Sequence, residues 1–285
     1  MKPYLILILL VTIAFANSLK NSFVWDDHNL IVDNPKINMP VKEMPMLFKT
    51  SFWELSKGSP GSYYRPLVSL LFVLNYKIWG PVPIGFHLIN ILFHLINAIL
   101  LYRAGLLLLD NDNNKHLISL MAASLFAIHP VHNEPVGRAA SGEVIFGFFV
   151  ILTLDLFLKD RKYLSPIAFA LALLSKEAAV MLPFGLVVLT VRKKGLKQGV
   201  IAIIPYIVLV GIYLVLRMIV AKSVFGDDEG QLAFARLLTM IVATFDYIRL
   251  LTIPYLLSPF YSAKSYALFE PKVLIAILVL ISVFV

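Results

Sequence analysis

The chain has 285 residues, of which 59% are apolar and 15% charged, and its mean hydropathy is +0.84. Soluble domains hold about 45–50% apolar residues and more charge, so this composition excludes an ordinary soluble enzyme, a disordered chain and a coiled coil. The absence of cysteine excludes a disulfide framework, a thiolate metal site and a cysteine nucleophile. Most of the net charge of +8 lies in short clusters between apolar runs, which indicates membrane topology rather than a nucleic-acid partner. The sequence predicts an integral, multi-pass, all-α membrane protein.

Candidate membrane helices are runs almost free of charged residues, because about 20 apolar residues cross the hydrocarbon core. They lie at 3–19, 78–102, 117–129, 144–157, 163–175, 178–191, 198–216, 237–257 and 273–285. We therefore expect eight to nine spans in a single membrane domain over 1–285, with an outer loop at 20–66, a surface helix at 67–76 and a helical bundle at 78–285. The last run stops without a flanking charge, so we expect a chain truncated at its C-terminus.

The orientation follows from basic residues, which concentrate in short cytoplasmic loops. With the N-terminus inside, the clusters at 159–162 and 192–197 both lie inside and carry seven positive charges. Residues 1–16 also resemble a cleavable signal peptide, but the many later spans favour an uncleaved helix, and either way the chain from Asn17 onward is exported. Most unusual polar residues then lie outside, and polar groups that gather at one membrane boundary indicate a site. The topology after residue 222 stays open.

Asp26 and Asp27 directly follow the first predicted span. Adjacent carboxylates repel each other, so one carboxyl group is expected to have a raised pKa while the other stays an ionised base or ligand. The alternative is a helix N-cap or a turn, where Asp is also favoured. The dipeptide alone favours this second interpretation.

His129, His132 and Glu134 offer three side chains of the metal-ligand type within six residues. Pro130 and Pro135 flank the segment, so a kinked outer loop is expected rather than a regular helix. The spacing is not a recognised zinc motif, and hydrogen-bonded loop residues are the favoured interpretation. A metal ion, if one binds, would be held by Asp26, His132 and Glu134.

Arg65, Arg138 and Lys176 are cations at the predicted outer boundary. Arginine offers a bidentate fork and lysine a point charge for an anionic phosphate. The alternative is that they extend toward lipid headgroups, as any Lys or Arg at a helix end can do. This alternative is weaker for Lys176, which lies beside Glu177 between two short spans, in an expected crevice.

Polar residues inside the apolar runs are expected to have internal partners. Four recur at helical spacing on one face of the second run: His87, Asn90, His94 and Asn97. Interhelical hydrogen bonds are favoured there over metal ligation. Asp155 and Asp246 are likewise expected to pair internally or to lie near an interface.

An ordered series of motifs carries a family resemblance. It includes Asn21-x-Phe23-Val24-Trp25-Asp26-Asp27, Asn34-Pro35-x-Ile37, Tyr64-Arg65-Pro66-Leu67, Gly85-Phe86-His87-Leu88-x-Asn90, His94-x-x-Asn97, His129-Pro130-Val131-His132-x-Glu134, Gly142-Glu143 and Ser175-Lys176-Glu177. The series resembles the polytopic GT-C glycosyltransferases that use polyprenyl-phosphate sugars. It is most similar to the transmembrane O-mannosyltransferases with tetratricopeptide repeats and to their bacterial relatives, well over residues 1–190 and loosely beyond.

The resemblance implies a GT-C-like helical bundle whose outer loop carries the catalytic pair Asp27 and Asp26. One aspartate would act as general base on an acceptor hydroxyl, which attacks the anomeric carbon with inversion, and Asp27 is preferred. The donor would be a sugar, mannose or another hexose, on polyprenyl or dolichyl phosphate. The acceptor would be a hydroxyl of an exported protein or glycan. The site would face outward from a bacterial cytoplasmic membrane or into the lumen from an endoplasmic reticulum membrane.

The same resemblance implies roles for the other outer residues. The leaving phosphate matches Arg65, Arg138 and Lys176, and acceptor or donor positioning matches Tyr64, His129, His132, Glu134 and Glu177. No cofactor is implied for certain. A divalent metal is an open alternative, less needed with a lipid-phosphate donor than with a nucleotide sugar.

Two other functions are weighed against the transferase. An ion- or proton-coupled transporter would place its ionisable residues near the membrane midplane on broken helices, whereas most of them here lie in outer loops. A catalytically inactive fragment is the third hypothesis, because relatives have further spans and often a repeat domain, and this sequence ends at Val285.

Overall fold

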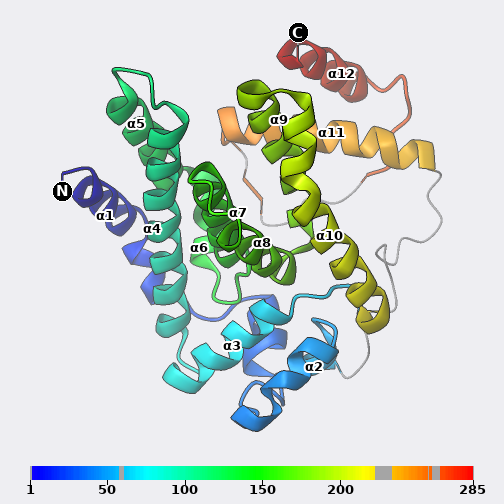
Figure 1. The fold of residues 1–285 in the computed structure, drawn as a ribbon. Helices are drawn as coiled ribbons and strands as arrows, with labels where there is room; N and C mark the ends of the chain where they lie inside the picture. The colour runs from blue at the N-terminus through cyan, green and yellow to red at the C-terminus, as the bar shows by residue number, and fades with distance from the viewer. Residues whose placement is uncertain (1, 58–60, 222–232, 256, 259–263, 285) are drawn as a thin grey trace. The chain divides into compact units, whose positions relative to one another are not determined.

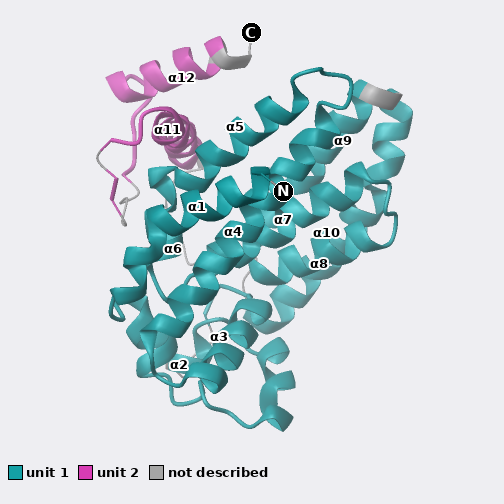
Figure 2. Ribbon diagram, turned by 90° about the vertical axis from the view of Figure 1, so that its left-hand side faces the viewer, with its two compact units in different colours: residues 1–226 teal, residues 227–285 magenta. Residues whose placement is uncertain are grey.

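The structure is a computed structural model that describes residues 2–57, 61–221, 233–255, 257–258 and 264–284. All regular secondary structure in these residues is helical, so the predicted all-helical class is confirmed. The chain divides into two compact units, residues 1–226 and residues 227–285, drawn teal and magenta in Figure 2. The single membrane domain expected for 1–285 stays a prediction.

The first unit consists of helices joined by short turns (Figure 1). Its α-helices are α1 (Lys2–Phe15), α2 (Glu54–Lys57), α3 (Pro66–Trp79), α4 (Pro83–Leu108), α5 (Lys115–Ile128), α6 (Asn133–Gly137), α7 (Glu143–Leu158), α8 (Leu164–Ser175), α9 (Leu182–Lys194) and α10 (Leu196–Ala221). Short 3₁₀- or π-helical segments lie between them: η1 (Ala16–Lys20), η2 (His28–Val32), η3 (Val41–Lys49), η4 (Pro130–His132) and η5 (Glu177–Met181).

Proline and glycine set several helix ends. Pro66 and Pro83 stand in the first turns of α3 and α4, where the missing proline N–H would have had no helical partner. Gly80 directly follows the last residue of α3 and has a φ of +65°. Glycine reaches this left-handed conformation without a steric penalty, which makes it a common residue just beyond a helix.

Helix α4 is the centre of the bundle, since it packs against α1, α5 and α7. Helix α7 packs in turn against α8, and α10 packs against both α8 and α9. Two apolar clusters hold these helices together. Leu7, Val11 and Ala98 are buried in the cluster around α4. Phe169 and Leu186 are buried in the cluster around α8 and α9. The bundle therefore brings the ends of α7 and α8 next to segments that are distant in sequence.

The four polar residues predicted on one face of the second apolar run lie on α4. Three of them bind backbone carbonyls of neighbouring segments: Asn90 binds Arg138 at 2.7 Å, His94 binds Ala127 at 3.0 Å and Asn97 binds Val144 at 2.9 Å. The predicted interhelical hydrogen bonding is confirmed for these three. His87 is fully buried, and its ring nitrogens have no hydrogen-bond partner among the described residues.

The segment 20–66 is folded around its own apolar core. Ile31 and Leu47 are almost completely buried, and they belong to a cluster that includes Phe86 of α4 and Ala139 and Ala140 beyond α6. Burying each large apolar side chain contributes about 1.5–3 kcal/mol relative to leaving it exposed. The loop is thus held against the start of the bundle, which fixes the residues that it carries.

Three helical stretches are long and apolar enough to cross a membrane: Lys2–Lys20, Pro83–Leu108 and Leu196–Ala221. Other apolar helices are shorter, such as α5 with 14 residues and α8 with 12, so they fall below the usual spanning length. A helical membrane protein is supported, but the count of eight to nine spans is not confirmed. Helix α3 covers the helix expected at 67–76, and its place at the membrane surface stays a prediction.

The second unit contains α11 (Ala233–Thr252) and α12 (Pro271–Phe284), packed through a small apolar core. Asp246 forms ion pairs with Lys272 at 2.8 Å and with Arg249 at 3.6 Å. The expected internal pairing of Asp246 is therefore confirmed.

Candidate functional site

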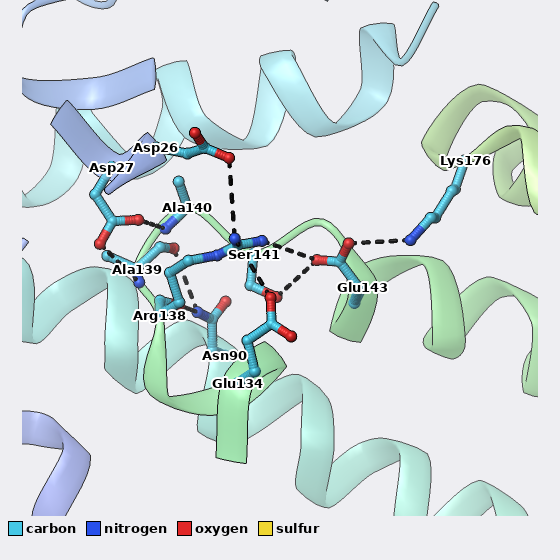
Figure 3. A network of polar contacts seen from close by, with 10 residues as sticks. All are labelled: Asp26, Asp27, Asn90, Glu134, Arg138, Ala139, Ala140, Ser141, Glu143 and Lys176. Carbon is cyan, nitrogen blue, oxygen red and sulfur yellow. Dashed lines mark hydrogen bonds and ion pairs between the residues drawn. The ribbon is translucent and has the colours of Figure 1, made fainter. Parts of the chain in front are cut away.

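A tight turn carries the two neighbouring aspartates. Trp25 has a φ of +51°, a left-handed conformation that is rare for a residue other than glycine. The amide of Asp27 donates to the carbonyl of Val24 at 2.9 Å, and the amide of Val24 donates back to Asp27 Oδ2 at 2.9 Å. The turn sends the two carboxylates in different directions (Figure 3).

The Asp27 carboxylate is fully buried and engaged by the backbone. Besides Val24, the amide of Ala140 donates to Oδ1 at 2.7 Å and the amide of Ala139 donates to Oδ2 at 3.4 Å. Hydrogen bonds to an ionised acceptor are about twice as strong as neutral ones and replace the water that burial removes. Asp27 thus ties the first loop to the segment between α6 and α7.

The Asp26 carboxylate is half-exposed. Its side chain is 47% exposed, and Oδ2 is 4.0 Å from Arg138 Nη1. Asp26 lines a cavity of about 60 Å³ together with Arg65, Arg138 and Lys176. The structure therefore brings one predicted carboxylate and all three predicted phosphate-binding cations to the same place.

Arg138 lies at the centre of a network of ion pairs (Figure 3). It contacts Glu134 at 3.4 Å and Glu143 at 3.7 Å in addition to Asp26. Glu143 also binds Lys176 Nζ at 3.0 Å. Burial alone would raise the pKa of Glu143, but Lys176 and Arg138 outweigh it and lower the pKa to about 2. Glu143 is thus an ionised bridge between two cations.

Glu134 has a different balance. Partial burial raises the pKa of Glu134, and the nearby carboxylates of Glu143 and Asp26 add to this shift. The opposing attraction of Arg138 does not cancel it. Glu134 therefore protonates more readily than Glu143.

Arg65 is fixed by a bidentate ion pair with Glu177. Its Nε donates to Oε2 at 3.0 Å and its Nη2 donates to Oε1 at 2.6 Å. The guanidinium also lies over the ring of Tyr63, 4.6 Å from its centroid. Burial alone would raise the pKa of Glu177, but the hydrogen bonds and charge of Arg65 lower it. The pair is pre-formed and ionised.

Tyr64 lies next to Arg65 in sequence but takes a structural position. Its side chain is buried, its hydroxyl donates to the carbonyl of Phe48 at 2.9 Å, and its own carbonyl accepts from Tyr213 at 3.3 Å. It does not line the Asp26 cavity. Its predicted role in positioning a substrate is untested.

His129 and His132, from the outer loop that Pro130 and Pro135 flank, pack among rings. His132 lies 4.8 Å from the ring of His94 and 4.5 Å from the ring of Phe126. Burial, together with His94 and His129, lowers the pKa of His132 to about 3. His129 accepts a hydrogen bond from the amide of Val131 at 3.3 Å and so caps η4.

The described residues hold no group of three or more His, Cys, Asp or Glu side chains arranged to bind a metal ion. The hypothetical ligand set Asp26, His132 and Glu134 is therefore not assembled here, and Asp26 and Glu134 meet at Arg138 instead. A metal requirement stays an open prediction.

Sequence reasoning assigned no role to Glu143, which links Arg138 to Lys176. The residue was visible in the Gly142-Glu143 motif, but an acidic residue that opens an apolar helix also fits the ordinary preference of helix N-termini for negative charge. The amides of Ala139 and Ala140, which hold Asp27, carry no side-chain signal at all.

Comparison with curated proteins identifies relatives. The protein O-mannosyl-transferase F38B6.6 of Caenorhabditis elegans is 31% identical over 222 residues, which are 76% of this chain and 31% of that protein. The human protein O-mannosyl-transferases TMTC3 and TMTC4 are 33% and 35% identical over 154 and 156 residues, which are 53% and 50% of this chain and 16% and 21% of those proteins. The resemblance to the transmembrane O-mannosyltransferases is confirmed.

The chain spans less than a third of the length of these O-mannosyl-transferases. No protein-family model matches it, and no solved structure was found to match it.

Proposed function

We propose that this chain carries the transfer site of a glycosyltransferase. It would move a sugar, mannose by its similarity to the O-mannosyl-transferases, from a polyprenyl-phosphate donor to a hydroxyl of an exported protein or glycan at the outer or lumenal membrane face. The observation that carries the proposal is the cavity in which the half-exposed carboxylate of Asp26 meets Arg65, Arg138 and Lys176. A base and several cations are the groups that such a transfer needs.

We assign the general base to Asp26, in place of the preferred Asp27. Asp26 accepts the proton of the acceptor hydroxyl while the hydroxyl oxygen forms a bond to the anomeric carbon. The bond from that carbon to the phosphate oxygen breaks on the opposite side, its electron pair stays on the phosphate, and the configuration inverts. Asp27 cannot reach a hydroxyl in this arrangement, because its buried carboxylate already binds three backbone amides.

The cations stabilise the leaving phosphate. A lipid phosphodiester carries one negative charge, and the departing phosphate gains a second, so donors placed beside it act mainly on the transition state. Arg138 and Lys176 share Glu143 as a partner, so each can turn from this carboxylate to the phosphate without becoming unpaired. Arg65 keeps its bidentate contact with Glu177 and acts through its fixed charge.

Donor binding has to widen the site. A cavity of about 60 Å³ is much smaller than the roughly 300–1,000 Å³ of ordinary ligand sites. Arg138, Glu143 and Lys176 all line the cavity, and Glu143 forms ion pairs with the other two. If Arg138 and Lys176 exchanged Glu143 for the donor phosphate, the cavity would open. The same exchange would place both cations beside the leaving group.

The test compares Asp26→Asn with Asp27→Asn in the full chain, embedded in membranes supplied with a polyprenyl-phosphate mannose and a serine- and threonine-containing peptide. Asp26→Asn is expected to lower the transfer rate by about 10²–10⁴ without changing thermal unfolding, since only a general base is lost. Asp27→Asn is expected to lower the midpoint of thermal unfolding, because an amide cannot accept all the hydrogen bonds of a buried carboxylate.

Asp33→Asn is the matched control, because Asp33 is an exposed carboxylate of the same loop, and its transfer rate should equal that of the unmodified chain. An unmodified rate in Asp26→Asn refutes the assignment of the base. A folded but inactive Asp27→Asn alongside an active Asp26→Asn returns the role to Asp27.

A further inference from the structure

A second cavity, of about 680 Å³, lies at the other end of α8 from Lys176. Its lining comes from the end of α7, the α7–α8 connection, α9 and α10, and includes Phe157, Arg161, Lys162, Leu189, Ile201 and Pro205. Arg161 and Lys162 precede the first residue of α8, whereas Lys176 follows its last. Twelve helical residues rise by about 18 Å, so this cavity is separate from the one at Asp26.

The walls of this cavity are mainly apolar. Phe157, Leu189, Ile201 and Pro205 present hydrocarbon surface. The hydroxyl groups in the wall already have hydrogen-bond partners. Ser165 donates to the carbonyl of Thr153 at 2.9 Å and shares a 2.7 Å hydrogen bond with the hydroxyl of Tyr206. The interior thus suits a hydrocarbon chain, and its volume lies within the range of ordinary ligand sites.

The rim of the cavity is basic. Neither Arg161 nor Lys162 has an ion-pair partner within the described ranges, and both are exposed. Their neighbour Lys159 differs, because it binds the buried carboxylate of Asp155 at 2.7 Å, which Arg103 approaches to 3.4 Å. That internal pairing was expected for Asp155 and is confirmed. Asp160 also lines the cavity, and its carboxylate is not counted as a free acceptor there because the residue already has a partner.

Further positive charge lies close by in sequence. Arg192 and Lys197 stand within two residues of the lining residues Thr190 and Gln198, and neither has an ion-pair partner among the described residues. The rim therefore attracts anions, and an arginine fork beside a lysine suits a phosphate group.

We propose that this cavity binds a glycerophospholipid with an anionic headgroup. The phosphate contacts Arg161 and Lys162, and an acyl chain lies along the apolar wall formed by α9 and α10. Basic pockets between helices at the cytoplasmic face are typical sites for such lipids, and the positive-inside rule predicts that this end of α8 is cytoplasmic. The site requires no part of the transfer chemistry, so each proposal can fail without the other.

The test uses the full chain, purified in an uncharged detergent and examined by native mass spectrometry. Three probes are added separately: dioleoyl phosphatidylglycerol, dioleoyl phosphatidylcholine and glycerol 3-phosphate. Retention of phosphatidylglycerol alone is the expected result. Arg161→Gln/Lys162→Gln is expected to weaken this retention about 30-fold, since each basic residue near a lipid phosphate strengthens binding by roughly fivefold.

Lys36→Gln/Lys42→Gln is the matched control, because it removes the same charge from exposed positions of the first loop. It should leave phosphatidylglycerol binding unchanged. Equal retention of phosphatidylcholine would overturn the anionic assignment, and equally tight binding of glycerol 3-phosphate would overturn the assignment to a lipid. A control variant that lost as much affinity as Arg161→Gln/Lys162→Gln would show a general charge effect and overturn the site.

A second variant tests the apolar wall without touching the charges. Ala202→Phe introduces a ring into the cavity lining and is expected to weaken phosphatidylglycerol binding by tenfold or more. Ile204→Phe on the same helix is its control, because Ile204 is 53% exposed and does not line the cavity. Unchanged binding in Ala202→Phe would refute the placement of the acyl chain, whatever the double variant shows.

Discussion

The two ends of α8 balance charge in opposite ways. Beyond its C-terminal end, Lys176 and Arg65 are each held by a carboxylate, at 3.0 Å and 2.6 Å. Before its N-terminal end, Arg161 and Lys162 have no carboxylate partner among the described residues. Partly buried charges must be paired because desolvation is costly, while exposed cations need no protein partner. The first end is therefore pre-assembled, and the second is left open to an external anion.

The comparison depends first on the two ends facing opposite sides of the membrane. In a chain without cysteine, Ser22→Cys and Tyr163→Cys each create a single labelling site at an exposed position. We expect a membrane-impermeant maleimide added to intact cells to label Ser22→Cys and not Tyr163→Cys, since basic short loops stay in the cytoplasm.

Permeabilised cells provide the control, in which both variants should be labelled. Labelling of both variants in intact cells would break the comparison and remove the topological basis of both proposals. This is the largest expected effect, because labelling is all or none.

A pH titration of the protein's stability tests the polar segment around His132 and Glu134. The pKa of His132 is about 3 in the folded chain, below the usual value of about 6.5. Between these two pH values His132 is protonated in the unfolded chain and neutral in the folded chain. The free energy of unfolding is therefore highest above pH 6.5 and falls as the pH drops toward 3. We expect a loss of about 1–2 kcal/mol between pH 6.5 and pH 5.

His132→Phe keeps a ring against His94 and Phe126 and should flatten this part of the profile, as measured by thermal unfolding in detergent. His28→Gln, at an exposed position, should leave the profile as it is. A profile equally steep in His132→Phe would assign the acid sensitivity to other groups. Glu143, with a pKa of about 2, contributes only below about pH 4.5.

The smallest effect compares one cation from each end. Lys176→Gln leaves Glu143 with one ion-pair partner among the described residues, Arg138 at 3.7 Å, and is expected to lower the free energy of unfolding by about 1 kcal/mol. Arg161→Gln removes no ion pair found among the described residues and should change it by less than about 0.5 kcal/mol. Chemical unfolding in mild detergent measures both, and equal losses would show that the two ends do not differ in charge pairing.

The sequence predicts which residues gather near Arg138 and Lys176 better than it predicts their contacts. The acidic pair and the three cations could be identified from their types and their motifs. The division between Asp26 and Asp27 could not, because it depends on the left-handed backbone of Trp25 and on amides of residues 139 and 140. His132 has the chemistry of a metal ligand, but its ring contacts with His94 and Phe126 could not be predicted, because these two residues come from α4 and α5.

The helical class follows from the sequence, because its apolar residues form long continuous runs. Transmembrane strands would instead alternate apolar and polar residues. The number of spans does not follow, because several of the counted apolar runs are shorter than the usual spanning length of about 20 residues. The runs 117–129 and 163–175 correspond to α5 and α8, which have 14 and 12 residues.

The hydrogen bonds of Asp27 also impose an order on biosynthesis. Its strongest contact is the amide of Ala140, 113 residues further along the chain. At a synthesis rate of about 5–20 residues per second, that partner emerges roughly 6–23 seconds after Asp27 itself. Helices α4 and α5 are made in the interval, so the first loop completes its fold only after they exist. The loop is thus early in the sequence and late in assembly, and until then its apolar core and its carboxylate are open to chaperones and to competing contacts.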